Sequence, residues 1–579
     1  MSAVPASVPS ASPVPALVPA PRSWRPRPGV HVVDERAELH TDPALAGEAR
    51  RLRRLLGAGG GLDLEPAGRI SATIRLRTDE ALGLEAFALD VRPDRIEVRA
   101  GGPAGASYAI EALRQLLPPD AYRRAVVAPP PWEVPCGTIE DEPVLAWRGV
   151  LLDVVRHFLP VREVLRFIDL MAMHRLNMLQ LHLSDDQGWR LEIDGFPELT
   201  SVASWRRASQ VGAGDDAPDD GRPHGGFYSR ADVAEIVAYA AERHVTIVPE
   251  IDLPGHVQAL VAARPDLGAG LDRAPGGGVV APEVWTRWGI SDHVLGLSDH
   301  VLETVGAILD DVLDQFPGPV LALGGDESPK VRWRRDPDVR RRLAELGLTR
   351  DADAQNWLLD RLAQRARARG RRVLLWDEVL EGAPVRDAVV ASWRGAHGIG
   401  TGLARGYDVV AAPADEVYLD YRESDDPREP VPVGVVTDVD RVLAFDPRRG
   451  VTGDEPGRLL GAQAHVWTEH VDSPRALDYR VFPRLAAFAE VVWRGGPSDP
   501  ADFRSRLATH ERRLEACGVE LRRADGPQPW QERPGVAGSP LERHELDAHL
   551  RRLVGLAPSL DRTPLRGGDT APRRSRVVR

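Results

Sequence analysis

Short, nearly continuous apolar runs recur through the middle of the chain, and a longer amphipathic segment follows most of them. Such a run predicts a strand buried on both faces, and its alternation with helical segments is typical of parallel strands joined by crossover helices. Eight runs predict a closed (β/α)8 TIM barrel, an α/β fold. The predicted strands are RGVLLDV (148–154), NMLQLHLSD (177–185), VTIVPEID (245–252), PVLALGGDE (319–327), RVLLWDE (372–378), AVVASWRG (388–395), EVYLD (416–420) and LLGAQAHVWTE (459–469).

The chain before these runs has a mixed pattern. Residues 44–56 have helical periodicity, whereas residues 71–78 and 85–100 alternate as half-buried strands do, with a turn at Pro93-Asp94. Residues 107–119 predict a helix that ends at a proline pair. These elements predict a small α+β domain.

The composition changes again at both ends. Prolines interrupt every apolar run near the start, which favours a disordered arm, and Pro, Gly and Arg dominate near the end, where a basic tail closes the chain. The expected regions are a Pro/Ala-rich arm (1–29), the small α+β domain (30–135), a catalytic barrel (140–520) and a largely irregular C-terminal extension (521–579).

Charge and cysteine content exclude several classes of function. The net charge of -12 argues against nucleic acid as the main partner, because phosphate binding needs a basic surface. Cys136 and Cys517 are too few for a disulfide framework or a cysteine-rich metal site. No segment has the roughly 18 uncharged apolar residues of a membrane helix, and the first residues lack the pattern of a secretory signal. We therefore expect a cytoplasmic protein with no membrane partner, and export by an atypical route is the alternative left open.

Two neighbouring acids, Asp326 and Glu327, directly follow an apolar run and the pair Gly324-Gly325. Consecutive Cα atoms lie about 3.8 Å apart, so both carboxylates can serve one locus. The glycines allow unusual dihedral angles and let a ligand approach the backbone closely. A helix-capping turn would explain this stretch equally well by itself.

The other predicted strands also end in polar or aromatic residues. Since a barrel of this class assembles its active site at the carboxyl ends of its strands, these side chains are expected to meet. Tryptophans beside carboxylates suit a sugar, which has apolar C–H faces and hydroxyl groups. The candidates beyond the central acids are Asp185, His256, Trp376, Trp393 and Trp467.

Metal and nucleotide sites are the competing interpretations. The candidate histidines stand on separate strands, and the chain has neither HExxH nor paired CxxC spacing. It also lacks the glycine patterns of dinucleotide-binding and phosphate-binding loops. We expect no metal and no cofactor.

The motifs together resemble glycoside hydrolase family 20, the β-N-acetylhexosaminidases, in the order in which that family has them. The resemblance covers about residues 30–500 and includes the small preceding domain. The motifs that carry it are RGVLLDVVRHFLP, HLSDDQGWRLEI, YSRADVAEIVAYAAERHVTIVPEIDLPGH, LGGDE, WDEVL, SWRG, YLD and GAQAHVWTEHV with the following YRVFPRLAAFAEVVW.

The resemblance implies an exo-acting enzyme that releases terminal GlcNAc or GalNAc from β-linked N-acetylhexosamine glycosides, with the substrate's acetamido oxygen as the nucleophile and an oxazolinium intermediate. Glu327 would be the general acid and base, and Asp326 and Tyr418 would hold the acetamido group. Asp185 and His256 would support the acid. The residues expected to bind the sugar are Arg148, Trp376, Trp393, Asp420, Trp467 and Glu469.

The sequence departs from the family at Ala322, where the family usually has histidine two residues before the glycine pair. This departure keeps open a non-catalytic sugar-binding barrel. A retaining glycosidase that uses one of its own carboxylates as the nucleophile is the second alternative.

Overall fold

The computed structural model describes residues 15–66 and 72–556, which form two compact units. The first unit contains the described residues up to Val144, Met173–Arg175 and Ala489–Leu521, and the second contains the rest. The sequence assigned residues 489–520 to the barrel. They belong to the first unit because side chains of this segment bind its backbone: Arg506 donates to the carbonyl of Leu17 at 2.6 Å and Arg513 to that of Gln115 at 2.7 Å.

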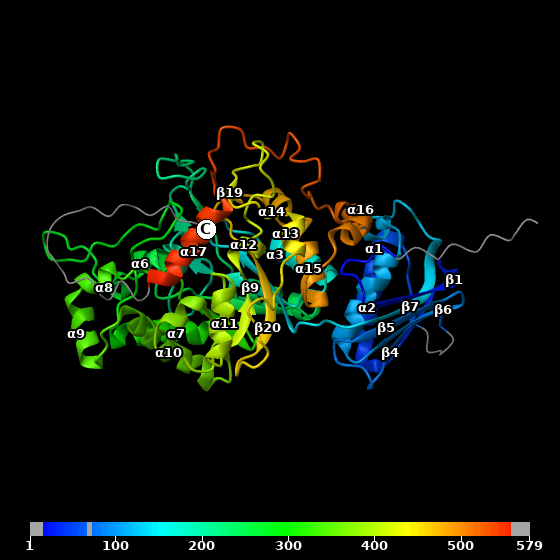
Figure 1. The fold of residues 1–579 in the computed structure, drawn as a ribbon, viewed down its shortest axis with the longest axis horizontal. Helices are drawn as coiled ribbons and strands as arrows, with labels where there is room; N and C mark the ends of the chain where they lie inside the picture. Colours follow the sequence, from blue (N-terminus) through cyan, green and yellow to red (C-terminus); the bar gives the residue numbers. More distant parts are fainter. Residues whose placement is uncertain (1–14, 67–71, 557–579) are drawn as a thin grey trace, which may run out of the picture. The chain divides into compact units, whose positions relative to one another are not determined.

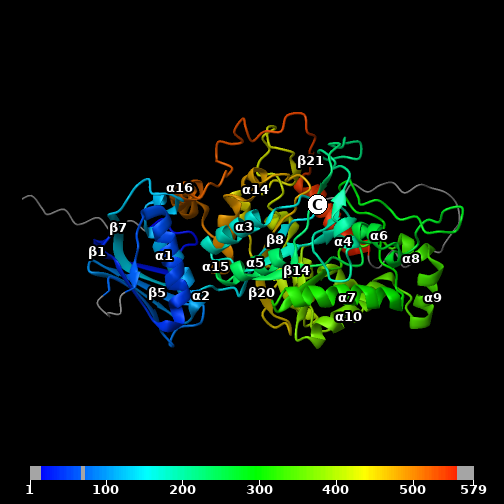
Figure 2. The same cartoon turned by 180° about the vertical axis from the view of Figure 1, so that it is seen from behind.

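The first unit is built on a mixed seven-stranded sheet, in which β5 and β6 form the predicted hairpin with Arg92 opposite Arg95. Helices α1 and α2 lie along the same side of the sheet in both views (Figures 1 and 2). In spatial order the strands are β1 (Ser23–Val33), β7 (Trp132–Asp141), β5 (Phe87–Arg92), β6 (Arg95–Ala100), β4 (Ile74–Thr78), β2 (Glu38–Thr41) and β3 (Glu65–Pro66), and the unit's helices include α1 (Ala46–Gly60), α2 (Pro103–Leu116) and α16 (Pro500–Ala516).

The predicted arm (1–29) is ordered over part of its length. Strand β1 begins at Ser23, which pairs with Glu140 of β7, and Leu17 is fully buried in the core of this unit. Proline-rich composition misled the prediction here, because β1 lies at the edge of its sheet, where a strand tolerates proline. Residues 1–14 lie outside the described part of the chain.

The second unit is a closed barrel of eight parallel strands, as the sequence predicts. Residue pairs such as Asp153 with His182 and Glu250 with Ala322 fix the register between neighbours. In spatial order the strands are β8 (Trp147–Asp153), β9 (Met178–His182), β14 (Thr246–Glu250), β15 (Val320–Gly324), β16 (Arg372–Trp376), β17 (Val389–Ser392), β18 (Asp408–Ala411) and β20 (Leu459–Val466).

The seventh strand differs from the prediction. All four residues of β18 (Asp408–Ala411) are buried, whereas the predicted strand EVYLD (416–420) begins as helix α12 (Ala414–Val417) and continues as a loop. Pro413 caps α12 and separates it from β18. The prediction chose the run EVYLD because it ends in a polar residue, whereas Val409 and Val410 before it form the ladder with β17. Tyr418 still reaches the sheet through a single bridge to His465.

Helices surround the barrel, and the two that the sequence marks most clearly, α3 (Val161–Met173) and α5 (Arg230–Ala241), form as predicted. The side chains of Ser229 and Asp232 cap the start of α5 reciprocally. The other helices include α4 (Glu198–Ser201), α6 (Gln258–Ala263), α7 (Asp299–Gln315), α8 (Val331–Arg335), α9 (Pro337–Leu346), α10 (Asp351–Ala368), α11 (Ala396–Ala404), α13 (Val439–Leu443), α14 (Pro474–Val481) and α15 (Arg484–Arg494). Three short two-stranded sheets lie in the loops: β10 (Ser184–Asp185) pairs with β11 (Gly188–Trp189), β12 (Trp205–Arg206) with β13 (His224–Gly225), and β19 (Val433–Gly434) with β21 (Ser539–Pro540).

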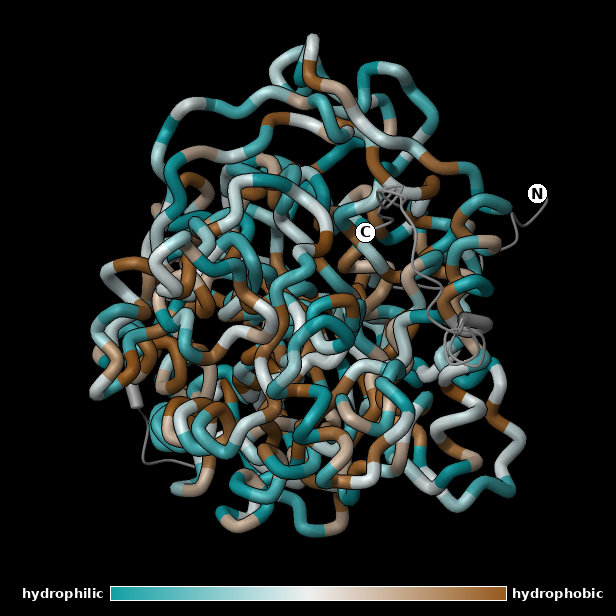
Figure 3. Tube along the Cα trace, turned by 90° about the vertical axis from the view of Figure 1, so that its left-hand side faces the viewer, coloured by the Kyte–Doolittle hydropathy of each residue, from teal (hydrophilic) through white to brown (hydrophobic). Residues whose placement is uncertain are grey.

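The C-terminal extension is more regular than predicted, because it contains helix α17 (Arg543–Leu556) after β21. The basic tail lies beyond the described residues. Hydrophobic positions are interspersed with hydrophilic ones along the trace (Figure 3), and no described helix is long and apolar enough to cross a bilayer. The cytoplasmic location stays a prediction.

Candidate active site

Buried charged residues follow the carboxyl ends of the first four barrel strands. His182, the last residue of β9, lies between two carboxylates: its Nδ1 is 2.8 Å from Glu250 and its Nε2 is 2.9 Å from Asp185. Burial disfavours a charge on this ring, but Glu250 and Asp185 outweigh it and raise the pKa of His182 to about 9. His182 is therefore a buried cation at neutral pH.

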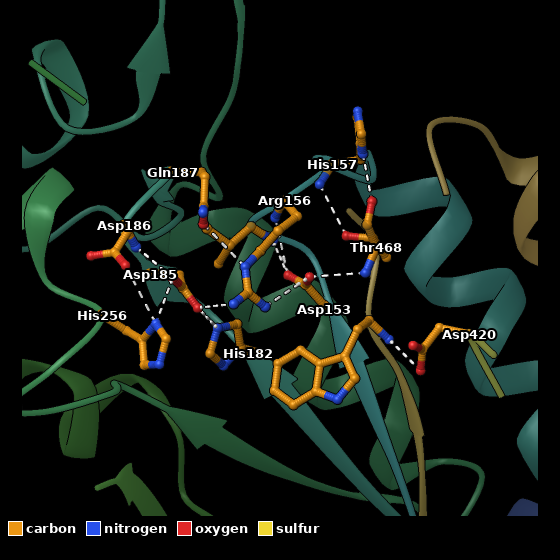
Figure 4. Close-up of polar contacts among 12 residues, drawn as sticks. Asp153, Arg156, His157, His182, Asp185, Asp186, Gln187, His256, Asp420 and Thr468 are labelled. Atoms are coloured by element: carbon orange, nitrogen blue, oxygen red, sulfur yellow. Dashed lines mark hydrogen bonds and ion pairs between the residues drawn. The ribbon is translucent and has the colours of Figure 1, made fainter. Parts of the chain in front are cut away.

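Asp185 is the centre of this group (Figure 4). Besides His182, its carboxylate lies 3.1 Å from Nδ1 of His256 and 2.5 Å from Nη2 of Arg156. Although burial opposes its ionisation, Arg156 and His256 hold the pKa of Asp185 well below its usual range. Asp185 is thus a fixed negative charge that orients three cationic or polar partners.

His256 connects this charge to the two central acids. Its Nε2 lies 3.8 Å from Oε2 of Glu327 and 3.9 Å from Oδ2 of Asp326. Both His256 and Glu327 have left-handed backbone angles, with φ of 52° and 41°. Side chains rarely adopt these angles, and such strain is concentrated at functional sites. The chain Asp185, His256, Glu327 therefore has the geometry of a supported acid.

A third buried carboxyl group, that of Asp252, lies against the glycines that precede the pair. The backbone N–H of Gly325 donates to Oδ1 of Asp252 at 3.1 Å, and burial together with Asp326 raises the pKa of Asp252 well above its usual value. A Cβ at Gly324 would come within 1.8 Å of the same oxygen. The glycine is required there because Asp252 occupies the space that a side chain would need.

The histidines and acids include three overlapping triplets whose potential ligand atoms lie within 4.8 Å of one another. However, both ring nitrogens of His182 face carboxylate oxygens and its pKa is raised to about 9, so this ring is protonated in the one triplet that contains it. Protonated groups are poor metal ligands. The triplets are drawn from His182, Asp185, Asp186, Asp252, His256 and Asp326.

Aromatic rings follow the other four strands. The rings of Trp376 and Tyr418 each lie 6.4 Å from that of Trp467, and Trp393 donates from Nε1 to Glu378 at 3.1 Å. All four rings are buried. They form one apolar wall, which is the surface that a sugar ring or an N-acetyl methyl group would contact.

Two further candidates, Asp420 and Glu469, line a cavity of about 480 Å³ together with Trp467. Burial, and the neighbouring charge of Glu469, raise the pKa of Asp420 to about 7. A pocket of this size can hold a small ligand, and carboxylates at its wall can accept hydrogen bonds from hydroxyl groups.

One predicted site residue, Arg148, does not lie with the others. It is the second residue of β8, and its Nη1 donates to the carbonyl of Leu145, which precedes the strand. A strand of this length spans roughly 20 Å, so Arg148 lies at the opposite end of the barrel from the site. The prediction for Arg148 is wrong.

Arg156 is the arginine that the sequence reasoning missed. It follows β8 and donates to Gln187 at 3.1 Å and to Asp153 at 3.2 Å (Figure 4). Its guanidinium carbon lies 5.1 Å from the centre of the Trp467 ring. The rule that barrel sites form after the strands could have found it. An arginine at the amino end of a strand cannot reach the site that an arginine after the carboxyl end can.

Comparisons with known proteins assign the chain to a family. Residues 145–496 match the family model "Glycosyl hydrolase family 20, catalytic domain", and residues 14–142 match its domain 2. The chain belongs to glycosyl hydrolase family 20. It is a family of glycoside hydrolases, so the retaining-glycosidase and sugar-binding alternatives have to be weighed within that family.

Similar proteins carry related names. A beta-hexosaminidase of Porphyromonas gingivalis is 34% identical, over 81% of this chain but only 58% of that protein's length. A beta-N-acetylhexosaminidase of Cellulomonas fimi is 32% identical, over 83% of this chain and 88% of that protein. The match thus spans the greater part of some relatives and little more than half of another.

Solved structures share the fold. The GH20 beta-N-acetylhexosaminidase of Streptomyces coelicolor is 31% identical, with a TM-score of 0.75, and the match covers 89% of this chain and 98% of that one. The exo beta-N-acetylglucosaminidase of Vibrio harveyi, solved with N-acetylglucosamine, is 28% identical, with a TM-score of 0.77 over 91% of this chain and 80% of that one.

Proposed function

We propose that this protein is an exo-acting β-N-acetylhexosaminidase that removes a terminal, non-reducing GlcNAc or GalNAc residue. The observation that carries the proposal is the pair Asp326-Glu327 after β15, with His256 and Asp185 behind it. The names of the relatives and the N-acetylglucosamine bound by the Vibrio harveyi enzyme support it.

The nucleophile of the proposed reaction is the acetamido oxygen of the substrate. An ordinary retaining glycosidase places two carboxyl groups about 5–5.5 Å apart on either side of the glycosidic bond, and family 20 is an exception to that scheme. Neighbouring acids suit the exception. The acetamido oxygen bonds to C1 as the glycosidic bond breaks, which gives an oxazolinium ion and an alcohol.

Glu327 moves the proton in both steps. It protonates the departing glycosidic oxygen, and its carboxylate then takes a proton from the water that adds to C1 and opens the oxazolinium ring. His256 lies 3.8 Å from it and would orient it, with Asp185 holding the ring of His256 in place. The second step restores the acid and the original anomeric configuration.

Asp326 and Tyr418 position the attacking group. Asp326 accepts the acetamido N–H and stabilises the positive charge that develops on the ring, while the hydroxyl of Tyr418 donates to the acetamido oxygen. Asp420, Glu469 and Arg156, in place of Arg148, would bind the sugar hydroxyls. The tryptophan wall would contact the sugar ring and the methyl group.

Two aryl substrates with one leaving group test the proposal: the β-glycoside of GlcNAc and that of glucose. We expect hydrolysis of the first only, because glucose has no acetamido oxygen. Faster hydrolysis of the glucoside would instead support a carboxylate nucleophile of the protein. Binding of GlcNAc without hydrolysis of either substrate would support the non-catalytic reading that Ala322 leaves open.

A further inference from the structure

The C-terminal segment returns to the candidate site after the barrel is complete. Strand β21 pairs with β19, and the backbone N–H of Ser539 donates to Pro432 at 2.8 Å and that of Leu541 to Gly434 at 2.9 Å. Residues 538–541 line the same cavity as Asp420, Trp467 and Glu469. This segment is therefore one wall of that cavity.

Helix α17 continues this wall. Arg543 at its start donates to the carbonyls of Asp415 and Val436 at 3.1 and 3.0 Å, and Figure 1 shows the helix, in red, close to α12. Leu546 is fully buried and Leu550 is 7% exposed. Both belong to the hydrophobic cluster that contains the site's tryptophan wall and Tyr418. The apolar face of the helix thus packs into the same hydrophobic cluster as the site's aromatic rings.

His549 lies on the same face. It is three residues after Leu546 and precedes Leu550, positions that share one side of an α-helix. Burial lowers the pKa of His549, and the carboxylate of Glu327 opposes that shift. His549 therefore stands beside Leu546 and Leu550 on the buried face of α17.

The site is nearly closed in this arrangement. The side chains of Glu327 and Asp326 are 4% and 6% exposed. In an exo-acting enzyme the sugar enters the pocket and the leaving group points outward, attached to the oxygen that the acid protonates. Whatever covers the acid from outside consequently limits the leaving group.

We propose that residues 538–550 form the leaving-group wall of the active site, and that Leu546, His549 and Leu550 on α17 determine how large a leaving group the enzyme accepts. This inference rests on the proposed function. While α17 is docked, a small aryl group fits beside Glu327, whereas a sugar chain has to displace the helix or is excluded.

Two variants and two substrates test this. The substrates are an aryl β-GlcNAc and a β-linked GlcNAc trimer, and the measured quantity is the ratio of their kcat/KM values, trimer over aryl. Leu546→Asp should undock α17 and raise the ratio by about tenfold, since steric discrimination in a pocket is of that order. His549→Ala leaves the two leucines in place and should raise the ratio by a smaller factor, about threefold.

Arg551→Ala is the matched control, because Arg551 is an exposed residue of the same helix. It should leave the ratio unchanged. Hydrogen exchange of residues 543–553 reports docking independently: protection is expected in the parent and in His549→Ala, and its loss in Leu546→Asp.

The inference is overturned if α17 loses protection in Leu546→Asp while the ratio stays within twofold of the parent value, or if α17 is unprotected in the parent. If the parent hydrolyses neither substrate, the proposed function fails instead. The proposed wall is then tested by measuring binding affinities. Leu546→Asp should strengthen binding of the trimer relative to binding of GlcNAc, and an unchanged affinity ratio would reject the wall.

Discussion

The carboxyl end of the barrel has two halves, which shift the pKa of a buried carboxyl group in opposite directions. After β8, β9, β14 and β15, Asp185 is surrounded by Arg156, His182 and His256, and its pKa lies well below the usual range. After β16, β17, β18 and β20, burial raises the pKa of Glu378 to about 8 and that of Asp420 to about 7. Asp252 is the exception in the first half, because it has no hydrogen-bonded cation among its described contacts.

This difference separates two tasks within one site. A carboxylate with buried cationic partners stays ionised and can orient and tune an acid. A carboxyl beside aromatic rings, in a drier environment, can be neutral near pH 7 and then both donates and accepts hydrogen bonds, as sugar hydroxyls do. The charged half suits proton transfer and the aromatic half suits binding.

The largest expected effect is on the charged half. Glu327→Gln removes the transferable proton, so kcat towards a β-GlcNAc substrate with a poor leaving group should fall by about 10² or more. Glu303→Gln, at an exposed position on α7, is the control and should keep the parent rate. Retention of more than about a tenth of the rate by Glu327→Gln would show that another group transfers the proton.

A smaller effect on kcat is expected at Asp185, which contacts Glu327 only through His256. Asp185→Asn keeps the shape but removes the charge that holds His256 and Arg156, so kcat should fall by about tenfold with little change in KM. The pH profile of kcat should also shift, which a purely structural loss would not produce. An unchanged profile with a lower amount of folded enzyme would assign Asp185 a structural role only.

The aromatic half should respond in KM. Trp393→Ala removes an apolar surface and the hydrogen bond to Glu378, and KM should rise by about tenfold, or ~1.4 kcal/mol, while kcat changes less. Trp393→Phe restores a ring and should recover most of the loss. A fall in kcat at constant KM would contradict the division between the two halves.

The smallest expected effect is on stability. The unfolded chain loses the proton of Glu378 near pH 4.5, whereas burial keeps it in the folded chain up to about pH 8. The folded state binds more protons in that window, so the free energy of unfolding falls as pH rises through it. His182 acts in the same direction: its charge stabilises the fold fully below about pH 6.5, and that contribution is lost as pH rises through about 9.

Thermal unfolding between pH 5 and pH 9 therefore measures this effect. The parent should lose stability steadily towards pH 9, and Glu378→Gln should flatten the lower part of the slope, up to about pH 8. Parallel slopes in the two proteins would mean that Glu378 ionises in the folded state as it does in the unfolded one.

The apolar runs were sufficient to predict the closed barrel, because a parallel strand that is buried on both faces is a nearly continuous run of apolar residues. They failed at β18, where valines within a longer apolar stretch form the strand and the more conspicuous EVYLD does not. The expectation for Arg148 came from the family resemblance, although the predicted strand 148–154 already placed this arginine at the amino end, away from the site. Helix α17 was missed because its apolar face is satisfied by tertiary contacts with distant residues.

The most direct test of the account replaces the acetamido methyl hydrogens of one aryl β-GlcNAc by fluorine, one at a time, with the leaving group unchanged. Fluorine withdraws electrons from the amide oxygen, so kcat should fall steeply and steadily with each substitution if that oxygen attacks C1. A rate that does not depend on fluorine content would contradict the account, because the nucleophile would then belong to the protein or to water.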